Sequence, residues 1–430
     1  AGFNLFNSLR IGKAEDYIAY IVTPGKTDAG MDTIRLSKVH DGVDMAGQAK
    51  LHDYYSQRFV VYENLSYEKS WGVHSIQTGL TYYLGKSTRN GIEEPQRQQN
   101  AVFNGVYSFK DRYVFQGVLN YAGTYSFDKG ERYAMFPSAG LSWVISEEGF
   151  LKNLKAIDYL KIRAEAGMLG YESFLPPFYY LDRWAVNSTG SAFGPYSTGQ
   201  WFGSNTDNSV YRTTQGRVGN PDLTWEKRKE FNIGIDGLFL RRRLSVEINY
   251  FNNLRDGIVS QLANTLPLVV GVSGARPWYN YNKVRNFGLE AALQYTERLG
   301  DVRISIGGNA TVQNSKVLKW DEPNYRFDYQ TRVGKPTDAY WGQTYAGKFA
   351  TDAETGVIRQ VYDDDLKAGD LKYVDRNGDG IVDDNDQSQI GYTSPRLIYA
   401  LNLKLAYRNL ELTAIGNGRA FYQLPLTNKY

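Results

Sequence analysis

One segment of the sequence has the residue types and spacing of a cation-binding loop. From Asp375 onward, oxygen-bearing side chains occupy positions 1, 3, 5, 9 and 12, and a glycine occupies position 6. In such loops the alternate oxygens converge on Ca²⁺, the glycine permits a sharp turn, and the carboxylate at the last position closes the shell. We therefore predict a structural Ca²⁺ site whose ligands are the side chains of Asp375, Asn377, Asp379, Asp383 and Asp386 and the backbone carbonyl of Ile381.

The same acidic segment has a simpler explanation. Asp386 stands where calcium loops usually carry a glutamate, and its shorter side chain closes a coordination shell less readily. The flanking residues also lack the pattern of paired EF-hand helices, so the alternative is a solvated acidic turn without a metal. Nothing nearby suggests hydrolytic chemistry. Since the sequence has no Ser/His/Asp or Cys/His arrangement that would indicate a catalytic nucleophile, we do not expect an enzyme.

Aromatic residues are concentrated between residues 171 and 229. Sugar rings stack on aromatic faces, and Asn, Asp and Arg side chains nearby bind hydroxyl groups. We predict substrate contacts at Tyr179, Tyr180, Trp184 and Trp201. The alternative, which the composition of protein interfaces favours, is that these rings pack the loop on itself or cover a partner protein.

The composition excludes several classes of protein. The 430 residues contain no cysteine and three histidines, so we expect neither a disulfide framework nor a Cys- or His-rich zinc site. The formal net charge of +3 gives no indication of nucleic-acid binding. No segment approaches the ~18 uninterrupted apolar residues of a membrane-spanning helix. Tyrosine, with 34 residues, outnumbers phenylalanine, with 20, as suits a membrane–water interface or a wet binding surface.

The elements that must position these residues are long strands with alternating apolar and polar side chains. Residues 159–168 alternate so that their charged side chains all lie on one side of a strand. Residues 113–125 alternate over a length that exceeds the usual strand of about 5–6 residues and satisfies the ~9–11 that a tilted strand needs to cross a bilayer. About twelve such strands occur. The side chains expected on their polar, interior-facing side include Arg163, Glu165, Asp236, Glu247 and Arg303.

The connections between these strands fall into two lengths. Short polar ones, such as residues 110–112 and 241–243, alternate with long ones at residues 171–229, 256–286 and 316–394. Every long connection falls on the same side of the strands, although the segment 146–157 is long for the opposite side. Short turns on one side and long loops on the other are typical of outer-membrane β-barrels, in which the short turns are periplasmic and the long loops extracellular.

Four sequence elements, in the same order, resemble the SusC-like (RagA-like) family of TonB-dependent outer-membrane transporters. The elements are FPS followed by WVISEE and FL at residues 136–151, GNPDLTWEK at residues 219–227, VGKP before YWG at residues 333–342, and DRNGDGIVDDND at residues 375–386. The resemblance implies an all-β chain, residues 1–430, that forms part of an antiparallel transmembrane barrel of roughly 22 strands. Residues 316–394 would be a long extracellular loop region that carries the calcium-loop motif. The family's N-terminal plug, its TonB box and its closing C-terminal strands are not recognisable in this sequence, so we expect a fragment.

The resemblance also implies a function. It predicts import of oligosaccharides or peptides across the outer membrane of a Gram-negative, Bacteroidota-like bacterium, with a SusD-like surface lipoprotein as partner. TonB would act through the N-terminal region that this sequence lacks, and outer-membrane lipid would surround the strands. One alternative is a passive porin. Another is a secreted, β-rich calcium-binding adhesion protein, for which the apolar faces at Leu397, Tyr399 and Leu401 would face water.

Overall fold

In the structure, a computed structural model, the regular secondary structure of the described residues is almost entirely β-strand. It describes residues 2–12, 19–27, 30–40, 49–89, 95–152, 154–172, 175–187, 200–202, 211–264, 276–362 and 365–424. The chain divides into two compact units, residues 1–63 with 82–99 and residues 64–81 with 100–430. Within the described residues, no helix has the length and apolar character needed to cross a bilayer.

The first unit is built from antiparallel strand pairs. β1 (Gly2–Gly12) pairs with β4 (Ala49–Trp71), with a shift in register between Arg10 and Ile11. β2 (Ala19–Lys26) and β3 (Asp32–His40) form a separate hairpin. Both β4 and β5 (His74–Arg89) continue from this unit into the second one.

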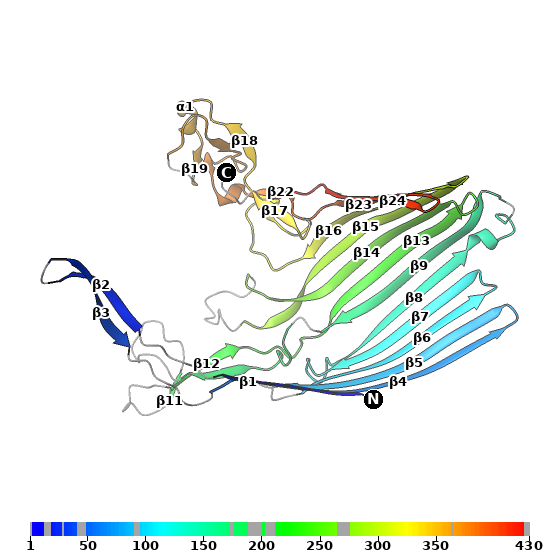
Figure 1. The fold of residues 1–430 in the computed structure, drawn as a ribbon, viewed down its shortest axis with the longest axis horizontal. Helices are drawn as coiled ribbons and strands as arrows, with labels where there is room; N and C mark the ends of the chain where they lie inside the picture. Colours follow the sequence, from blue (N-terminus) through cyan, green and yellow to red (C-terminus); the bar gives the residue numbers. More distant parts are fainter. Residues whose placement is uncertain are drawn as a thin grey trace. The chain divides into compact units, whose positions relative to one another are not determined.

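The second unit is dominated by one antiparallel sheet (Figure 1). The order of strands is β4–β5–β6–β7–β8–β9–β13–β14–β15–β16–β23–β24, and with β1 next to β4 the sheet has 13 strands. The predicted antiparallel all-β architecture is therefore confirmed. The remaining strands of the sheet are β6 (Gln96–Phe109), β7 (Tyr113–Thr124), β8 (Tyr133–Val144), β9 (Ile157–Tyr171), β13 (Glu226–Phe239), β14 (Leu244–Gln261), β15 (Trp278–Leu299), β16 (Val302–Lys319), β23 (Leu397–Tyr407) and β24 (Leu410–Ala420).

The register gives the sheet two chemically different faces. Paired residues of antiparallel strands point to the same side. Ile235 pairs with Ile162 on one neighbour and Ile248 on the other, whereas Asp236 pairs with Lys161 and Glu247. The alternation in sequence is therefore in phase across the strands, and it produces one apolar and one polar face.

The strands next to the long connections extend further than their alternation predicts. β14 has 18 residues and β15 has 22, so the connection between them is residues 262–277 and not 256–286. In these extensions, polar side chains pair across the strands. The Lys283 ammonium lies 3.0 Å from the Asp256 carboxylate, and the Arg285 guanidinium donates to Asn252 at 2.8 Å. Such cross-strand pairs maintain the sheet where apolar alternation ends.

The described connections follow the predicted sorting by length with one exception, residues 145–156, which are a longer connection than residues 125–132 on the opposite edge. Because the strands are antiparallel and ordered along the chain, the short connections share one edge of the sheet, called here the short-turn edge, and the long ones share the other. The segment 145–156, with a 3-10 helix η1 (Ile145–Glu147), belongs to the short-turn edge. The other short connections in the second unit are residues 72–73, 110–112, 240–243, 300–301 and 408–409, and the long ones are 125–132, 172–225, 262–277 and 320–396.

The long connections contain small sheets of their own. Between β9 and β13 lies the three-stranded order β10 (Arg183–Asn187), β12 (Tyr211–Arg217) and β11 (Gln200–Phe202). Between β16 and β23, three two-stranded sheets pack with short helices. These elements are η3 (Asp328–Gln330), β17 (Ala339–Gly342), β18 (Tyr345–Lys348), α1 (Asp352–Thr355), β19 (Arg359–Gln360), β20 (Leu371–Tyr373), β21 (Ile381–Val382), η4 (Asp384–Asp386) and β22 (Ser388–Tyr392).

Candidate functional site

The polar face of the sheet carries a charge network centred on Arg163. Its guanidinium Nε lies 3.3 Å from the Asp236 carboxylate, and a terminal nitrogen lies 3.1 Å from Glu247 and also donates to Asn249. The Lys161 ammonium completes the group at 2.7 Å from Asp236. Gly234 makes room for the Arg163 side chain, because a Cβ at this position would lie 2.9 Å from the guanidinium carbon.

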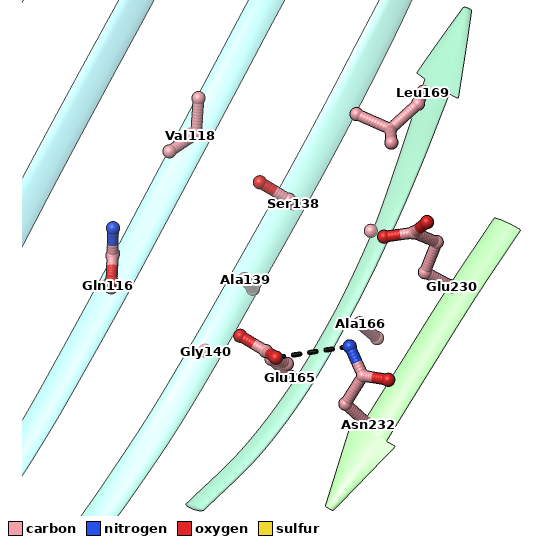
Figure 2. Close-up of a pocket in the computed structure, with 11 residues that line it drawn as sticks. Gln116, Val118, Ser138, Ala139, Gly140, Glu165, Ala166, Leu169, Glu230 and Asn232 are labelled. Atoms are coloured by element: carbon pink, nitrogen blue, oxygen red, sulfur yellow. Dashed lines mark hydrogen bonds between the residues drawn. The ribbon is translucent and has the colours of Figure 1, made fainter. Parts of the chain in front are cut away.

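A shallow polar hollow lies on the same face, next to this network (Figure 2). Its volume is about 240 Å³, and it spans strands β7, β8, β9 and β13. Its floor is formed by small residues, and at Gly167 a Cβ would come within 2.7 Å of the Ser138 side chain. Asn232 donates to Glu165 at 3.1 Å across the hollow. The lining residues are Gln116, Val118, Ser138, Ala139, Gly140, Glu165, Ala166, Gly167, Leu169, Glu230 and Asn232.

The chemistry of this hollow is hydrogen bonding and not catalysis. Amide, hydroxyl and carboxylate groups converge on one open surface, and they match the hydroxyl and amide groups of polar solutes. The polar face continues on strands β14 to β24, where a second recess of about 330 Å³ is lined by residues that include Glu247, Gln294, Asn309 and Asn402. A continuous polar surface of this kind is a path along which a solute exchanges one set of hydrogen bonds for the next.

The opposite face exposes large apolar side chains along the whole sheet. Leu141 and Leu401 are each 61% exposed, and Ile306 is 54% exposed. Soluble monomers rarely expose continuous apolar patches of more than a few hundred Å². Tyr399 and Leu401 belong to this exposed apolar face, whereas Leu397 is half-buried.

A row of aromatic rings crosses the strands near the short-turn edge. Trp71 stacks on His74 at 5.4 Å between ring centroids, and Tyr113 stacks on Trp143 at 6.3 Å, with Phe109 beside Tyr113 at 6.2 Å. The Tyr113 hydroxyl and the Trp143 indole nitrogen both donate to Glu148, at 2.7 and 3.2 Å. These hydrogen bonds lower the pKa of the Glu148 carboxyl. Rows of amphipathic rings mark the level of the lipid head groups in membrane barrels.

The NPDLTWE segment proves to be a structural anchor at the long-loop edge. Trp225 packs between Phe127 and Phe136, with ring centroids at 5.6 and 5.3 Å. Together with Ala122 and Leu223, these residues form a buried apolar cluster. The clustering of loop residues on the β7–β8 hairpin could not be read from the sequence, which gave the segment only as a family resemblance.

Polar residues of the same segment fasten it to the strands. Asn220 donates to the Trp278 carbonyl at 2.7 Å. Glu226 is buried, lies 3.1 Å from the Arg255 guanidinium and accepts the Val259 N–H at 2.9 Å. The sequence gives no signal for this role, because the burial of Glu226 and its two partners on β14 become visible only in the structure.

The four aromatic residues predicted to bind substrate have different surroundings in the structure. Tyr179 packs against Trp278 and lies under the Arg217 guanidinium at 4.1 Å, so it is a packing residue of the anchored loop. Tyr180 contacts Phe178 edge-on. Trp184 is 59% exposed on β10, and Trp201 pairs with Arg212 in the same small sheet, but its side chain lies outside the described residues. Their role in substrate binding stays a prediction.

The predicted calcium loop folds as a ring of side-chain-to-backbone hydrogen bonds. Asp375 accepts the N–H groups of Gly378 and Gly380 at 2.7 and 2.8 Å. Asp386 is 1% exposed and accepts the Arg376 and Asp383 N–H groups at 2.7 and 2.9 Å.

The same loop also ties its remaining predicted ligands to its own backbone. Asp379 accepts the Ile381 N–H at 2.9 Å, Asn377 accepts the Asp379 N–H at 2.9 Å, and Asp383 accepts the Asn385 N–H at 2.7 Å. Among the described residues, no three His, Cys, Asp or Glu side chains come together as a metal-binding group. The Ca²⁺ site therefore stays a prediction.

Comparison with known proteins agrees with the fold. The sequence model of the family described as "TonB dependent receptor-like, beta-barrel" matches residues 20–417. The TonB-dependent receptor SusC of Bacteroides thetaiotaomicron is 28% identical over 334 residues, which cover 75% of this chain and 31% of SusC. The TonB-dependent receptor P26 of Formosa agariphila is 28% identical over 348 residues, 75% of this chain and 32% of that protein.

A solved structure supports the same arrangement of strands. The structure described as the RagAB peptide transporter superposes with a TM-score of 0.64 at 15% identity, over 84% of this chain and 41% of the matched chain. This similarity concerns the fold alone. The chain spans about a third of the length of the curated relatives it matches.

Proposed function

The chain belongs to the TonB-dependent receptor-like β-barrel family, and we propose that it forms part of the barrel wall of an outer-membrane transporter that imports a polar nutrient. The relatives are TonB-dependent receptors and not enzymes, and this chain is not an enzyme. The proposal rests on one observation, which is that the same sheet has a polar face and an exposed apolar face. The polar face bears the Arg163 network and the hollow, and the other face exposes apolar side chains such as Leu141 and Leu401.

The chemistry of the hollow supports an oligosaccharide or a peptide as the solute. Gln116, Ser138 and Asn232 offer both donors and acceptors, as hydroxyl and amide groups require. The adjacent network is nearly balanced, because Lys161 and Arg163 face Asp236 and Glu247. The hollow itself adds Glu165 and Glu230, of which Glu230 pairs with Arg228. The surface therefore disfavours anionic solutes and suits neutral or zwitterionic ones.

We propose two protein partners for the complete transporter. A SusD-like surface lipoprotein would cover the long-loop edge, in keeping with the similarity to SusC and to the RagAB transporter. TonB would supply energy through a region of the protein outside this chain. We also propose that the loop of residues 375–386 binds Ca²⁺ as a structural ion, on the basis of its ligand spacing.

The two alternatives make different physical demands. A passive porin would conduct the same solutes without TonB. A secreted adhesion protein would leave the apolar face in water, and the exposure of Ile306, Tyr399 and Leu401 argues against it.

The test is uptake by cells that produce the full-length protein and its partner lipoprotein. The change Asn232→Leu replaces a hydrogen-bonding group of the hollow with an apolar group of similar size. We expect uptake of labelled oligosaccharide or peptide to fall roughly fivefold, which corresponds to one lost hydrogen bond of about 1 kcal/mol. The matched control Asn409→Leu makes the same change in the exposed turn between β23 and β24, away from the polar face of the strands, and should leave uptake unchanged.

Three results would contradict the proposal. Uptake that continues at the parent rate in cells without TonB would indicate a porin. Recovery of the full-length protein outside the membrane fraction would favour the secreted protein. Equal uptake by the Asn232→Leu variant and the parent would mean that the solute does not bind in the hollow during uptake.

A further inference from the structure

The short-turn edge of the second unit carries exposed cations that the transport proposal does not use. The turn between β13 and β14 contains three consecutive arginines, Arg241, Arg242 and Arg243. The segment that precedes β9 lies against this turn, because the Leu240 N–H donates to the Ala156 carbonyl at 3.0 Å. The exposed side chains of Lys155, Arg241 and Arg242 therefore lie at one place on the edge, and they are called here the basic patch.

The neighbouring carboxylates do not form ion pairs with the cations of the basic patch, so the patch keeps a positive charge. Glu297 is engaged by Arg243, at 2.5 Å. Asp158 accepts the backbone N–H of Arg242 at 2.8 Å and so fixes the turn without contacting the guanidinium in an ion pair. In the part of the chain that the structure describes, the ion pairs of this edge include none with Lys155, Arg241 or Arg242.

The turn holds its arginines in an unusual backbone conformation. Leu240, Arg241 and Arg242 have φ angles of +58°, +61° and +61°, the left-handed region that residues with side chains rarely adopt. Glycine would adopt these angles without strain. Lys110, Asp111 and Arg408 in other short turns of this edge share the conformation, which tight hairpin turns require. At this turn it places two guanidinium groups beyond the end of the sheet.

Exposed apolar side chains lie in the same two connections as the basic patch. Phe150 is 67% exposed, Leu154 is 50% exposed and Leu240 is 49% exposed, all at the same edge. The aromatic row that ends at Tyr113 and Trp143 lies on the adjoining strands. Cations next to exposed apolar groups suit the head-group layer of a bilayer, where acyl chains cover the apolar groups and phosphates meet the cations.

We propose that the basic patch binds the phosphate of an anionic phospholipid in the inner leaflet of the outer membrane. The planar guanidinium groups of Arg241 and Arg242 match the phosphate oxygens in a two-bond geometry, and the Lys155 ammonium adds a third cation. Phe150, Leu154 and Leu240 contact the first carbons of the acyl chains. The inference rests on the proposed function, because the short-turn edge of a barrel lies at the periplasmic leaflet only in an outer-membrane protein.

The test uses the full-length protein in nanodiscs of phosphatidylethanolamine, with or without phosphatidylglycerol. Native mass spectrometry counts the lipids that remain bound. The parent should retain phosphatidylglycerol in preference to phosphatidylethanolamine. The triple change Lys155→Gln, Arg241→Gln and Arg242→Gln should reduce this preference at least about tenfold, since each cation near an anionic surface contributes roughly a fivefold gain.

The matched control removes two cations of the same edge that already have partners. Lys152→Gln and Arg408→Gln break the ion pairs to Glu147 at 3.8 Å and to Asp301 at 3.5 Å. This variant should keep the parent preference. Loss of the preference in both variants to the same extent would mean general attraction between charges, and it would overturn the site.

Further outcomes separate the site from the proposed function. Equal retention of phosphatidylglycerol by the triple variant and the parent overturns the site. Displacement of the lipid by millimolar inorganic phosphate would mean that the patch binds free phosphate, and it would overturn the proposal that the ligand is a phospholipid. A parent protein that is recovered outside the outer membrane would overturn both proposals, whereas a membrane-bound parent without lipid preference overturns the site alone.

Discussion

The Arg396 guanidinium lies 2.8 Å from the Asp338 carboxylate, and this ion pair joins the start of β23 to the residue before β17. Both side chains are largely buried, at 13% and 15% exposure. Asp338 also accepts the Ser394 N–H at 3.0 Å. The pair therefore joins the two ends of residues 338–396, the larger part of the long connection of residues 320–396.

We expect this connection to lose stability in acid. Burial opposes ionisation of Asp338, but the hydrogen bonds from Arg396 and Ser394 outweigh it and hold the pKa of the carboxyl below its usual value. The stability that the pair provides is therefore complete above the pKa of an unfolded aspartate and is lost as the pH falls through the lower, folded pKa. Hydrogen exchange of residues 336–396, measured from neutral to acidic pH, should show this loss.

The isosteric change Asp338→Asn supplies the control for that measurement. It should weaken the connection by about 2 kcal/mol at neutral pH, as expected for a hydrogen bond to a charged group. It should also flatten the acid dependence of exchange in this segment. If the variant keeps the acid dependence of the parent, another carboxylate is responsible.

The anchor at the long-loop edge gives a second prediction. Trp225→Ala removes the ring between Phe127 and Phe136 and leaves a cavity, which should cost about 3–5 kcal/mol of local stability. The rate of hydrogen exchange at the amides of residues 219–226 should rise as this local stability is lost. The matched change Trp184→Ala removes a ring that is 59% exposed and should leave these amides protected. Similar exchange in both variants would show that Trp225 does not anchor the segment.

The sequence predicted the sheet well because the alternation reports burial directly. The charges of Lys161, Arg163 and Asp236 fall on one face in the sequence, and the register keeps them there. The ends of β14 and β15 were predicted too short, since pairs such as Lys283–Asp256 stabilise strands without alternation. Contacts between distant segments leave no local pattern, and the roles of Tyr179 as a packing residue and of Trp225 as an anchor depend on such contacts.

A charge placed on each face of β16 in turn would show whether the apolar face of the sheet contacts lipid or water. Ile306→Arg places a charge on the apolar face and should cost about 2–4 kcal/mol if that face lies near the middle of a bilayer. The control Asn309→Arg places the same charge on the polar face of the same strand and should be tolerated. Folding of the full-length protein into vesicles, titrated with urea, measures both. Equal stability of the two variants would mean that Ile306 faces water.

Calcium binding by residues 375–386 gives the last prediction. Because Asp379 contributes to the motif through its side chain, Asp379→Ala should abolish the rise in melting temperature that excess Ca²⁺ gives the parent protein over chelator. The control Asp365→Ala removes an exposed carboxylate of the same long connection, outside the motif, and should keep the response. A parent protein that melts at the same temperature with Ca²⁺ and with chelator would leave the loop as an acidic turn, held by the hydrogen bonds that Asp375 and Asp386 accept from its backbone.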